Sequence, residues 1–141
     1  MNSSIQILPG IKKIYWLDSD TLPARVDLYS VIKMRVAPLA DLNEMTFFGD
    51  PDCRRSTERD NNGLIQKATL KFNSADEIPF DKNMAFIVTD ANDRSYLIGS
   101  GEKPFARIKV EKLTGAPSED AAGYSYEVSH ESVRTMIECL I

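Results

Sequence analysis

The sequence predicts a mainly β fold, either an antiparallel β-sandwich or a small β-barrel of about eight strands, with a short C-terminal helix. Two observations carry this prediction. Several short segments alternate apolar and polar side chains with a period of two, and clusters of Gly, Pro, Asn, Asp and Ser separate them. No regular alternation of strands with long amphipathic helices is present, which disfavours a parallel sheet.

Residues 84–112 give the clearest signal, because they contain three successive predicted strands. The first, 84–90, is almost wholly apolar, and the second is 94–99. The third, 106–112, alternates strictly, as expected of a strand with one face in a core and the other in water. A three-stranded meander is stable only when another layer covers its apolar face, so the rest of the chain should supply that layer.

The first part of the chain is predicted to contain a flexible arm and two strands. Residues 1–10 are the expected arm, which ends at Pro9-Gly10. Residues 11–17 are rich in β-branched and aromatic side chains and form the first predicted strand, with Trp16 as a core anchor. A turn follows, and then a long alternating strand over 26–36.

Two further strands are predicted before residue 84. The shorter covers 45–48 and is ended by Gly49-Asp-Pro51. The longer covers 66–73 and places three apolar side chains on its inward face: Ala68, Leu70 and Phe72.

Between these two strands, residues 50–63 form the most polar segment of the chain and have no apolar period. They are therefore predicted to be an extended polar loop or a long hairpin arm. One hypothesis is a solvated hairpin; the other is an arm whose mixed charges pair with a neighbouring subunit. The residues expected to make such contacts are Asp52, Arg54, Arg55, Glu58, Arg59 and Asp60.

The C-terminal region contains one predicted strand, 123–130, followed by a change of period. Apolar residues recur with helical spacing at Val133, Met136, Ile137, Leu140 and Ile141. Residues 131–141 are therefore predicted to be a short helix, stable only when packed, and a final strand is the alternative.

Length and composition favour a single β-rich domain over residues 11–141 of this chain of 141 residues. The net charge of −4 gives no basic field for nucleic acid or anionic membranes, so neither is an expected partner. No signal peptide or span of about 20 apolar residues is visible. Cys53 and Cys139 lack metal or redox spacing and are expected to be free thiols.

Reaction chemistry is not indicated by any motif. His130 is the only histidine, and Ser129 or Ser132 could serve as a nucleophile beside it, but no nucleophile-elbow pattern surrounds them. The pattern therefore favours a structural histidine, and we expect no catalytic residue, no metal site, no cofactor and no enzymatic activity.

A non-catalytic ligand- or carbohydrate-binding β module is an alternative from another functional class. Its basis is a set of aromatic residues that could form a stacking platform: Trp16, Phe105, Tyr124 and Tyr126.

Several strings of the sequence resemble a known group of proteins. They are residues 46–53 (Thr-Phe-Phe-Gly-Asp-Pro-Asp-Cys), 56–63, 68–72, 86–90 with 94–99, and 124–130. Together they resemble small uncharacterised proteins encoded in prophage and phage structural gene modules of anaerobic gut bacteria. The resemblance covers residues 10–132 and transfers no catalytic residue.

This resemblance implies a virion component of the tail or the head–tail junction. Such subunits are typically small β-sandwiches or β-barrels with an extended loop, and they assemble as symmetric rings. The implied partners are further copies of this chain and neighbouring phage structural proteins. The implied location is the bacterial cytoplasm during synthesis and the virion after assembly.

Overall fold

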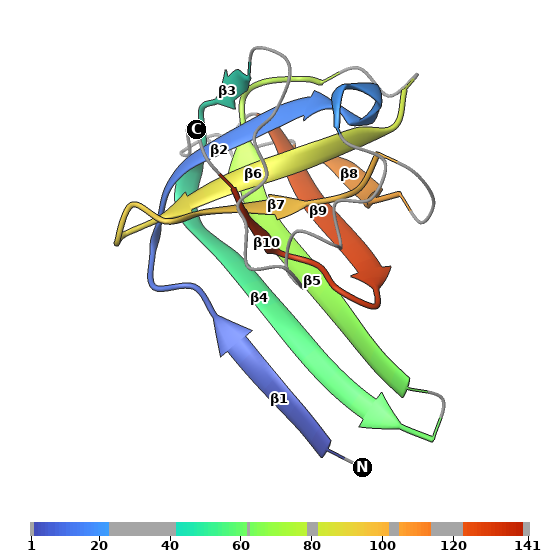
Figure 1. Ribbon diagram of the computed structural model, residues 1–141. Coiled ribbons are helices and arrows are strands. Elements are labelled where there is room, and N and C mark those ends of the chain that lie inside the picture. The colour runs from blue at the N-terminus through green and yellow to red at the C-terminus, as the bar shows by residue number, and fades with distance from the viewer. Residues whose placement is uncertain are drawn as a thin grey trace.

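The computed structural model describes residues 2–22, 42–61, 63–78, 82–101, 105–113 and 123–139. Within these residues, ten strands form two antiparallel sheets of five strands each (Figure 1). The predicted antiparallel β architecture is therefore confirmed, and its two separate sheets correspond to the sandwich.

The first sheet has the strand order β1-β4-β5-β9-β8. Its strands are β1 (Asn2–Ile7), β4 (Phe48–Asp60), β5 (Gly63–Ser74), β9 (Gly123–Ser132) and β8 (Arg107–Leu113). The second sheet has the order β10-β7-β6-β2-β3. Its strands are β10 (Ile137–Cys139), β7 (Ser95–Ile98), β6 (Met84–Asp90), β2 (Ile11–Asp18) and β3 (Asn43–Met45).

The main hydrophobic core lies between the two sheets. The first sheet contributes the predicted inward residues of β5, Ala68, Leu70 and Phe72, all of which are buried. The Phe72 ring stacks on Tyr126 of β9 at a centroid distance of 5.0 Å and meets Phe86 of β6 edge-on at 6.3 Å. The contact between Phe72 and Phe86 joins one sheet to the other.

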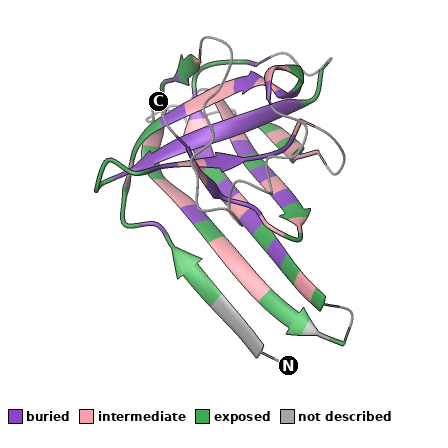
Figure 2. Ribbon diagram, viewed as in Figure 1, coloured by how far each residue is buried: buried purple, intermediate pink, exposed green. Residues whose placement is uncertain are grey.

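Strand β6 is buried on both of its faces, as the continuous purple ribbon in Figure 2 shows. Phe86 and Val88 face the main core, whereas Ala85 and Ile87 belong to a second hydrophobic cluster with Leu97. Burial on both faces explains why the sequence of this strand is continuously apolar and does not alternate.

The predicted turn after β6 is held by Asp90. Its Oδ1 atom accepts hydrogen bonds from the backbone N–H groups of Asn92, at 2.9 Å, and Arg94, at 3.0 Å. Asp93 adopts a positive φ of 63°, which Asp tolerates better than most residues. The hairpin from β6 to β7 therefore depends on local side-chain chemistry that the sequence displays.

The prediction of a flexible arm at residues 1–10 differs from the structure. Residues Asn2–Ile7 form β1, which pairs antiparallel with β4 from Asn2↔Arg59 to Ile7↔Arg54. The alternation of Ile5, Gln6 and Ile7 is that of a strand, although neither isoleucine enters the core.

The prediction of a C-terminal helix over residues 131–141 was wrong where the structure describes it. Ile137–Cys139 form β10, which pairs with β7, as the alternative strand hypothesis stated. Met136 has a φ of 49°, which is incompatible with a continuous right-handed helix. The helical spacing arose because Met136 and Ile137 enter different hydrophobic clusters, one on each side of a sheet.

The polar segment 50–63 is not an irregular loop. Nearly all of it belongs to β4, which pairs with β5 down to Asp60↔Gly63 and so makes the long hairpin that was the other expectation. The predicted strand over 26–36 lies outside the described residues. The predicted strand over 45–48 was wrong, because Met45 ends β3 and Phe48 begins β4, which continues through Gly49 and Pro51. The remaining predicted strands are confirmed within a few residues of their expected limits.

Gly99 allows β7 to approach β6 closely. Its φ is +133°, and an added Cβ would lie 2.6 Å from the Ala85 Cβ and 3.0 Å from the Ala85 Cα. Gly63 also has a positive φ, +110°, but an added Cβ there would meet nothing within 4 Å.

We therefore expect Gly99→Ala to lower the free energy of unfolding by about 1–3 kcal/mol more than Gly63→Ala, because only the first adds a clash to backbone strain. Urea denaturation of both variants measures this difference. Equal losses in the two variants would contradict the close approach.

Candidate functional site

The candidate functional site is a three-stranded arm that extends away from the body of the sandwich (Figure 1). We define the arm as β1 together with residues 54–60 of β4 and 63–67 of β5. Strand β9 pairs with β5 only from Gln66 onwards, so within the described part of the chain the outer end of the hairpin is paired only inside the arm. Exposed residues predominate towards its tip (Figure 2).

Strand alternation divides the charged residues expected at a subunit contact between two faces. Arg55 and Arg59 lie on the same face of β4 as Cys53, which faces the main core. We call this the inner face of the arm. The outer face carries Asp52, Arg54 and Glu58 by the same alternation. Asp60 ends β4, and its side chain lies outside the described residues. The six residues therefore do not form one cluster.

The outer face of the arm combines exposed apolar and charged side chains. Ile5 is 67% exposed, Ile7 57% and Ile65 38%, and all three lie on this face according to the strand register. Arg54 Nε lies 2.8 Å from Asp52 Oδ2 in an ion pair on the same face. A surface with isoleucines beside charges of both signs is typical of a protein contact region.

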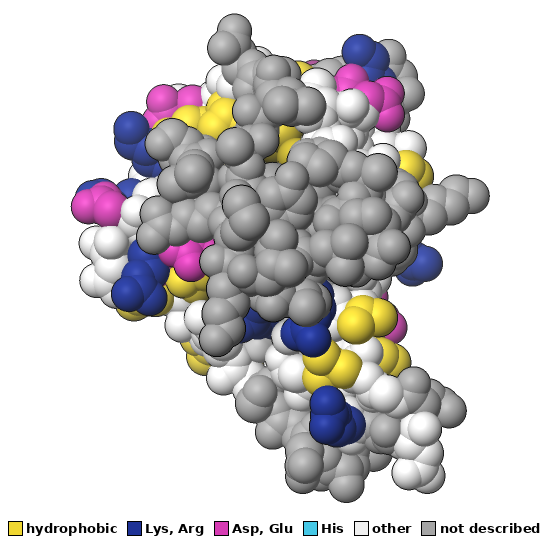
Figure 3. All heavy atoms as spheres, viewed as in Figure 1, with side chains coloured by type: hydrophobic (Ala, Val, Ile, Leu, Met, Phe, Trp, Pro, Cys, Tyr) yellow, Lys and Arg dark blue, Asp and Glu magenta, His cyan; other side chains and the backbone are white. Residues whose placement is uncertain are grey.

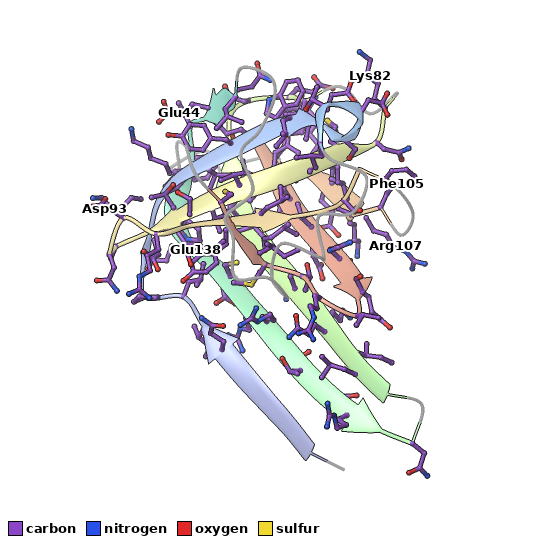
Figure 4. The ribbon with its side chains drawn as sticks, in the orientation of Figure 1. Glu44, Lys82, Asp93, Phe105, Arg107 and Glu138 are labelled. Carbon is purple, nitrogen blue, oxygen red and sulfur yellow. The ribbon has the colours of Figure 1, made fainter. Side chains whose placement is uncertain are left out.

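A groove continues the outer face from the arm onto the body. A depression of about 130 Å³ is lined by Ser56, Glu58, Ile65, Lys67 and Glu131. A second, of about 310 Å³, shares two of these residues and is lined by Lys67, Phe105, Arg107, Ser129 and Glu131. Arg107 begins β8, and Phe105 lies near it just before the strand (Figure 4). The groove therefore crosses four strands of the first sheet.

The inner face of the arm is attached to the body by a polar network. Arg55 donates from Nη1 to the Thr135 carbonyl at 3.2 Å and from Nη2 to the Gln6 side chain on β1. The Thr135 N–H donates to Gln66 Oε1 at 3.0 Å, and its Oγ1 lies 2.6 Å from His130 Nδ1. Partial burial lowers the pKa of the Arg55 guanidinium. This network replaces the apolar core where the arm begins.

Figure 3, viewed from the side of the second sheet, shows hydrophobic and basic side chains next to one another along the arm. On this face Arg59 is exposed and pairs in register with the half-buried Leu64. Both faces of the arm therefore present side chains suitable for contact with another protein.

His130 lies in this structural network, and of the two serines considered as nucleophiles only Ser132 shares its face of β9, two residues further along the strand. It is 2% exposed and faces inwards, opposite Ala68 in the register. Ser129 points to the other face of β9, where it lines the groove. The structure therefore does not bring Ser129 and His130 together.

The four aromatic residues of the alternative binding module do not form one exposed platform. Tyr126 is 1% exposed and stacks in the core. Trp16 packs against the same core from the second sheet, and Phe105 lines the groove. Tyr124 donates from its hydroxyl to Glu77 Oε2 at 2.9 Å, and this hydrogen bond raises the Tyr124 pKa.

Both cysteines are free and buried. The Cys53 thiol lies 3.9 Å from Met136 Sδ, and burial raises its pKa from 9.0 to about 12. Burial also raises the pKa of Cys139 from 9.0 to about 12. Both thiols are therefore protonated, and protected from reagents, in the folded protein at neutral pH.

Among the residues that the structure describes, no group of three or more His, Cys, Asp or Glu side chains is arranged to hold a metal ion. No helix in the same part of the chain is long and apolar enough to cross a membrane. Comparisons with protein-family models, curated proteins and solved structures found no match.

Sequence reasoning missed two parts of the candidate site. The first is β1 with its exposed isoleucines, although the period-two pattern Ile5-Gln6-Ile7 was a usable signal. The second is the network of Gln6, Gln66 and Thr135, whose members are far apart in the sequence. No local pattern identifies that network, because chain folding alone brings these residues together.

We expect Thr135→Val to lower the free energy of unfolding by about 1–3 kcal/mol, because it removes the hydroxyl that pairs with the buried His130. Thr57→Val is the matched control, because Thr57 is a half-buried threonine of β4. This substitution should change the free energy of unfolding by no more than about 0.5 kcal/mol. Denaturant titration of both variants measures the difference. Equal stabilities would contradict a structural role for the Thr135 hydroxyl.

Thiol reactivity provides a separate check of the core. We expect neither cysteine of the native protein to react with Ellman's reagent at pH 8, whereas both react in denaturant. Folding raises the pKa of both thiols. The contribution of the two thiols to the free energy of unfolding is therefore fully present below pH 9 and is lost as pH rises from 9 towards 12. Rapid labelling of either thiol in the native state would contradict their burial.

Proposed function

We propose that this protein is a phage-derived virion structural protein of the tail or head–tail junction, and that it acts by symmetric self-association through the arm. The observation that carries the proposal is a paired β arm that extends beyond the core and presents isoleucines to solvent. The sequence resemblance described above supplies the virion setting.

The exposed isoleucines support a contact with another protein. Burying an exposed isoleucine completely contributes roughly 1.5–3 kcal/mol, and Ile5, Ile7 and Ile65 lie on one face. None of them contributes to the hydrophobic clusters of the single subunit. Their burial in an assembly would therefore stabilise the assembly without a loss of core packing in the subunit.

The charges on the same face favour a second copy of this chain as the partner. Arg54 and Lys67 alternate with Glu58 and Glu131 along the arm and the groove. A surface with both signs can be complementary to itself, and juxtaposition of like charges disfavours other orientations. Electrostatics would thus fix the relative position of two subunits, while the isoleucines contribute binding energy.

The proposal assigns no catalytic role and no cofactor to the protein. The buried histidine is accounted for by its contact with Thr135 at the root of the arm. The alternative ligand-binding module has less support, because Tyr126 is in the core and the remaining aromatic residues lie on different elements.

Replacement of one isoleucine tests the proposed contact. We expect Ile65→Asp to weaken self-association at least about tenfold, because the removal of a carboxylate from water in an apolar contact costs more than about 1.4 kcal/mol. Asn92→Asp adds the same charge in the exposed β6–β7 turn and should leave association unchanged. Size-exclusion chromatography with light scattering over a concentration series measures both.

Circular dichroism should show that both variants keep the β fold. A protein that remains strictly monomeric at high concentration would defeat the proposed function. Equal association of the two variants would show that the outer face of the arm is not the contact.

A further inference from the structure

Strand β1 is attached to the rest of the molecule in an unusual way. It lies at the edge of the first sheet and, among the strands that the structure describes, pairs with β4 alone. The side chains of Ile5, Gln6 and Ile7 are all exposed, so this part of β1 contributes no side chain to a core. The ladder with β4 and the hydrogen bond between Gln6 and Arg55 therefore hold the strand in place.

The segment that follows β1 is fixed to the body. Leu8 is buried, and its N–H donates to the Cys53 carbonyl at 3.1 Å. The Pro9 carbonyl accepts a hydrogen bond from the Ala91 N–H at 3.1 Å, and Gly10 has a φ of +61°. A pivot between Leu8 and Pro9 would therefore release residues 2–8 as a unit and leave β2 in place.

We propose that residues 2–8 are exchanged between subunits in the assembly, so that β1 of one copy pairs with β4 of the next. This inference rests on the proposed function, because it names the partner and the mode of contact for the same arm. The exchanged strand would occupy the edge of β4 in the register seen here, with position 5 opposite position 56. Leu8 would fill the same apolar site in the neighbour.

The energetic balance favours exchange once subunits are close together. Every ladder bond of β1, the Gln6–Arg55 contact and the burial of Leu8 would be reproduced between chains, so little is lost except the conformation of the pivot. Ile5 and Ile7 would then lie at the junction of two subunits, where they can become buried. Because residues 2–8 would keep their whole register on the neighbour, the edge of the neighbouring β4 must lie directly beside the pivot.

A disulfide experiment distinguishes pairing within one chain from pairing between chains. Ile5→Cys and Ser56→Cys are made in separate chains, which are mixed in denaturant, refolded together and oxidised. Directly opposite residues of an antiparallel pair lie within the Cα distance that a disulfide requires. We expect a covalent dimer that mass spectrometry of its peptides assigns to a bond between positions 5 and 56.

The matched control pairs Gln6→Cys with Ser56→Cys, because Gln6 points to the opposite face and is opposite Arg55. This mixture should give little of the corresponding disulfide. Comparable yields in the two mixtures would overturn the proposed register. The native thiols are buried and should not interfere.

The outcomes also separate this inference from the proposed function. If light scattering detects oligomers but the mixture gives no disulfide between positions 5 and 56, strand exchange is wrong and self-association stands. If the two substitutions combined in one chain cross-link only within that chain, exchange is also wrong. A strictly monomeric protein overturns both proposals.

Discussion

The backbone ladder between β4 and β5 is the interaction on which the rest of the structure depends. It begins at Phe48↔Asn73 beside the core and continues to Asp60↔Gly63 at the tip of the arm. At its inner end the ladder holds Cys53 and Leu70 against the second sheet. At its outer end the same ladder continues without a covering sheet, so one pair of strands belongs to both the sandwich and the arm.

Where the arm leaves the body of the sandwich, polar side chains replace apolar ones on the inward face of the first sheet. Arg55 and His130 lie directly opposite the fully buried Ala68 in the register, and Gln66 is the next inward position of β5 towards the arm. These groups need hydrogen-bond partners because burial removes them from water. The backbone and hydroxyl of Thr135, between β9 and β10, satisfy several of them at once. This connection links the arm to the last strand of the second sheet.

A strand could be predicted from the sequence where at least one of its faces is buried. Strand β5 was predictable from Ala68, Leu70 and Phe72, and β6 from its continuous apolar run, since burial imposes those patterns. Most of β4 could not be recognised, because both of its faces are polar along the arm. The C-terminal strand was only the alternative prediction, because apolar residues that enter two clusters produced helical spacing by chance. The candidate site was anticipated as a charged segment, but its division into two faces needed the register.

If β1 is exchanged between subunits as proposed, the arm and the assembly are coupled through this strand. A two-stranded hairpin is at best marginally stable in water, and a third strand adds stability. In the structure that third strand is β1, which the core does not hold through Ile5, Gln6 or Ile7. If a neighbouring subunit supplies it, the order of each arm depends on the occupancy of its edge by another chain. Arm formation then varies with subunit concentration, as for any equilibrium in which binding stabilises the folded state. A subunit built in this way would complete its contact surface only where other copies are present.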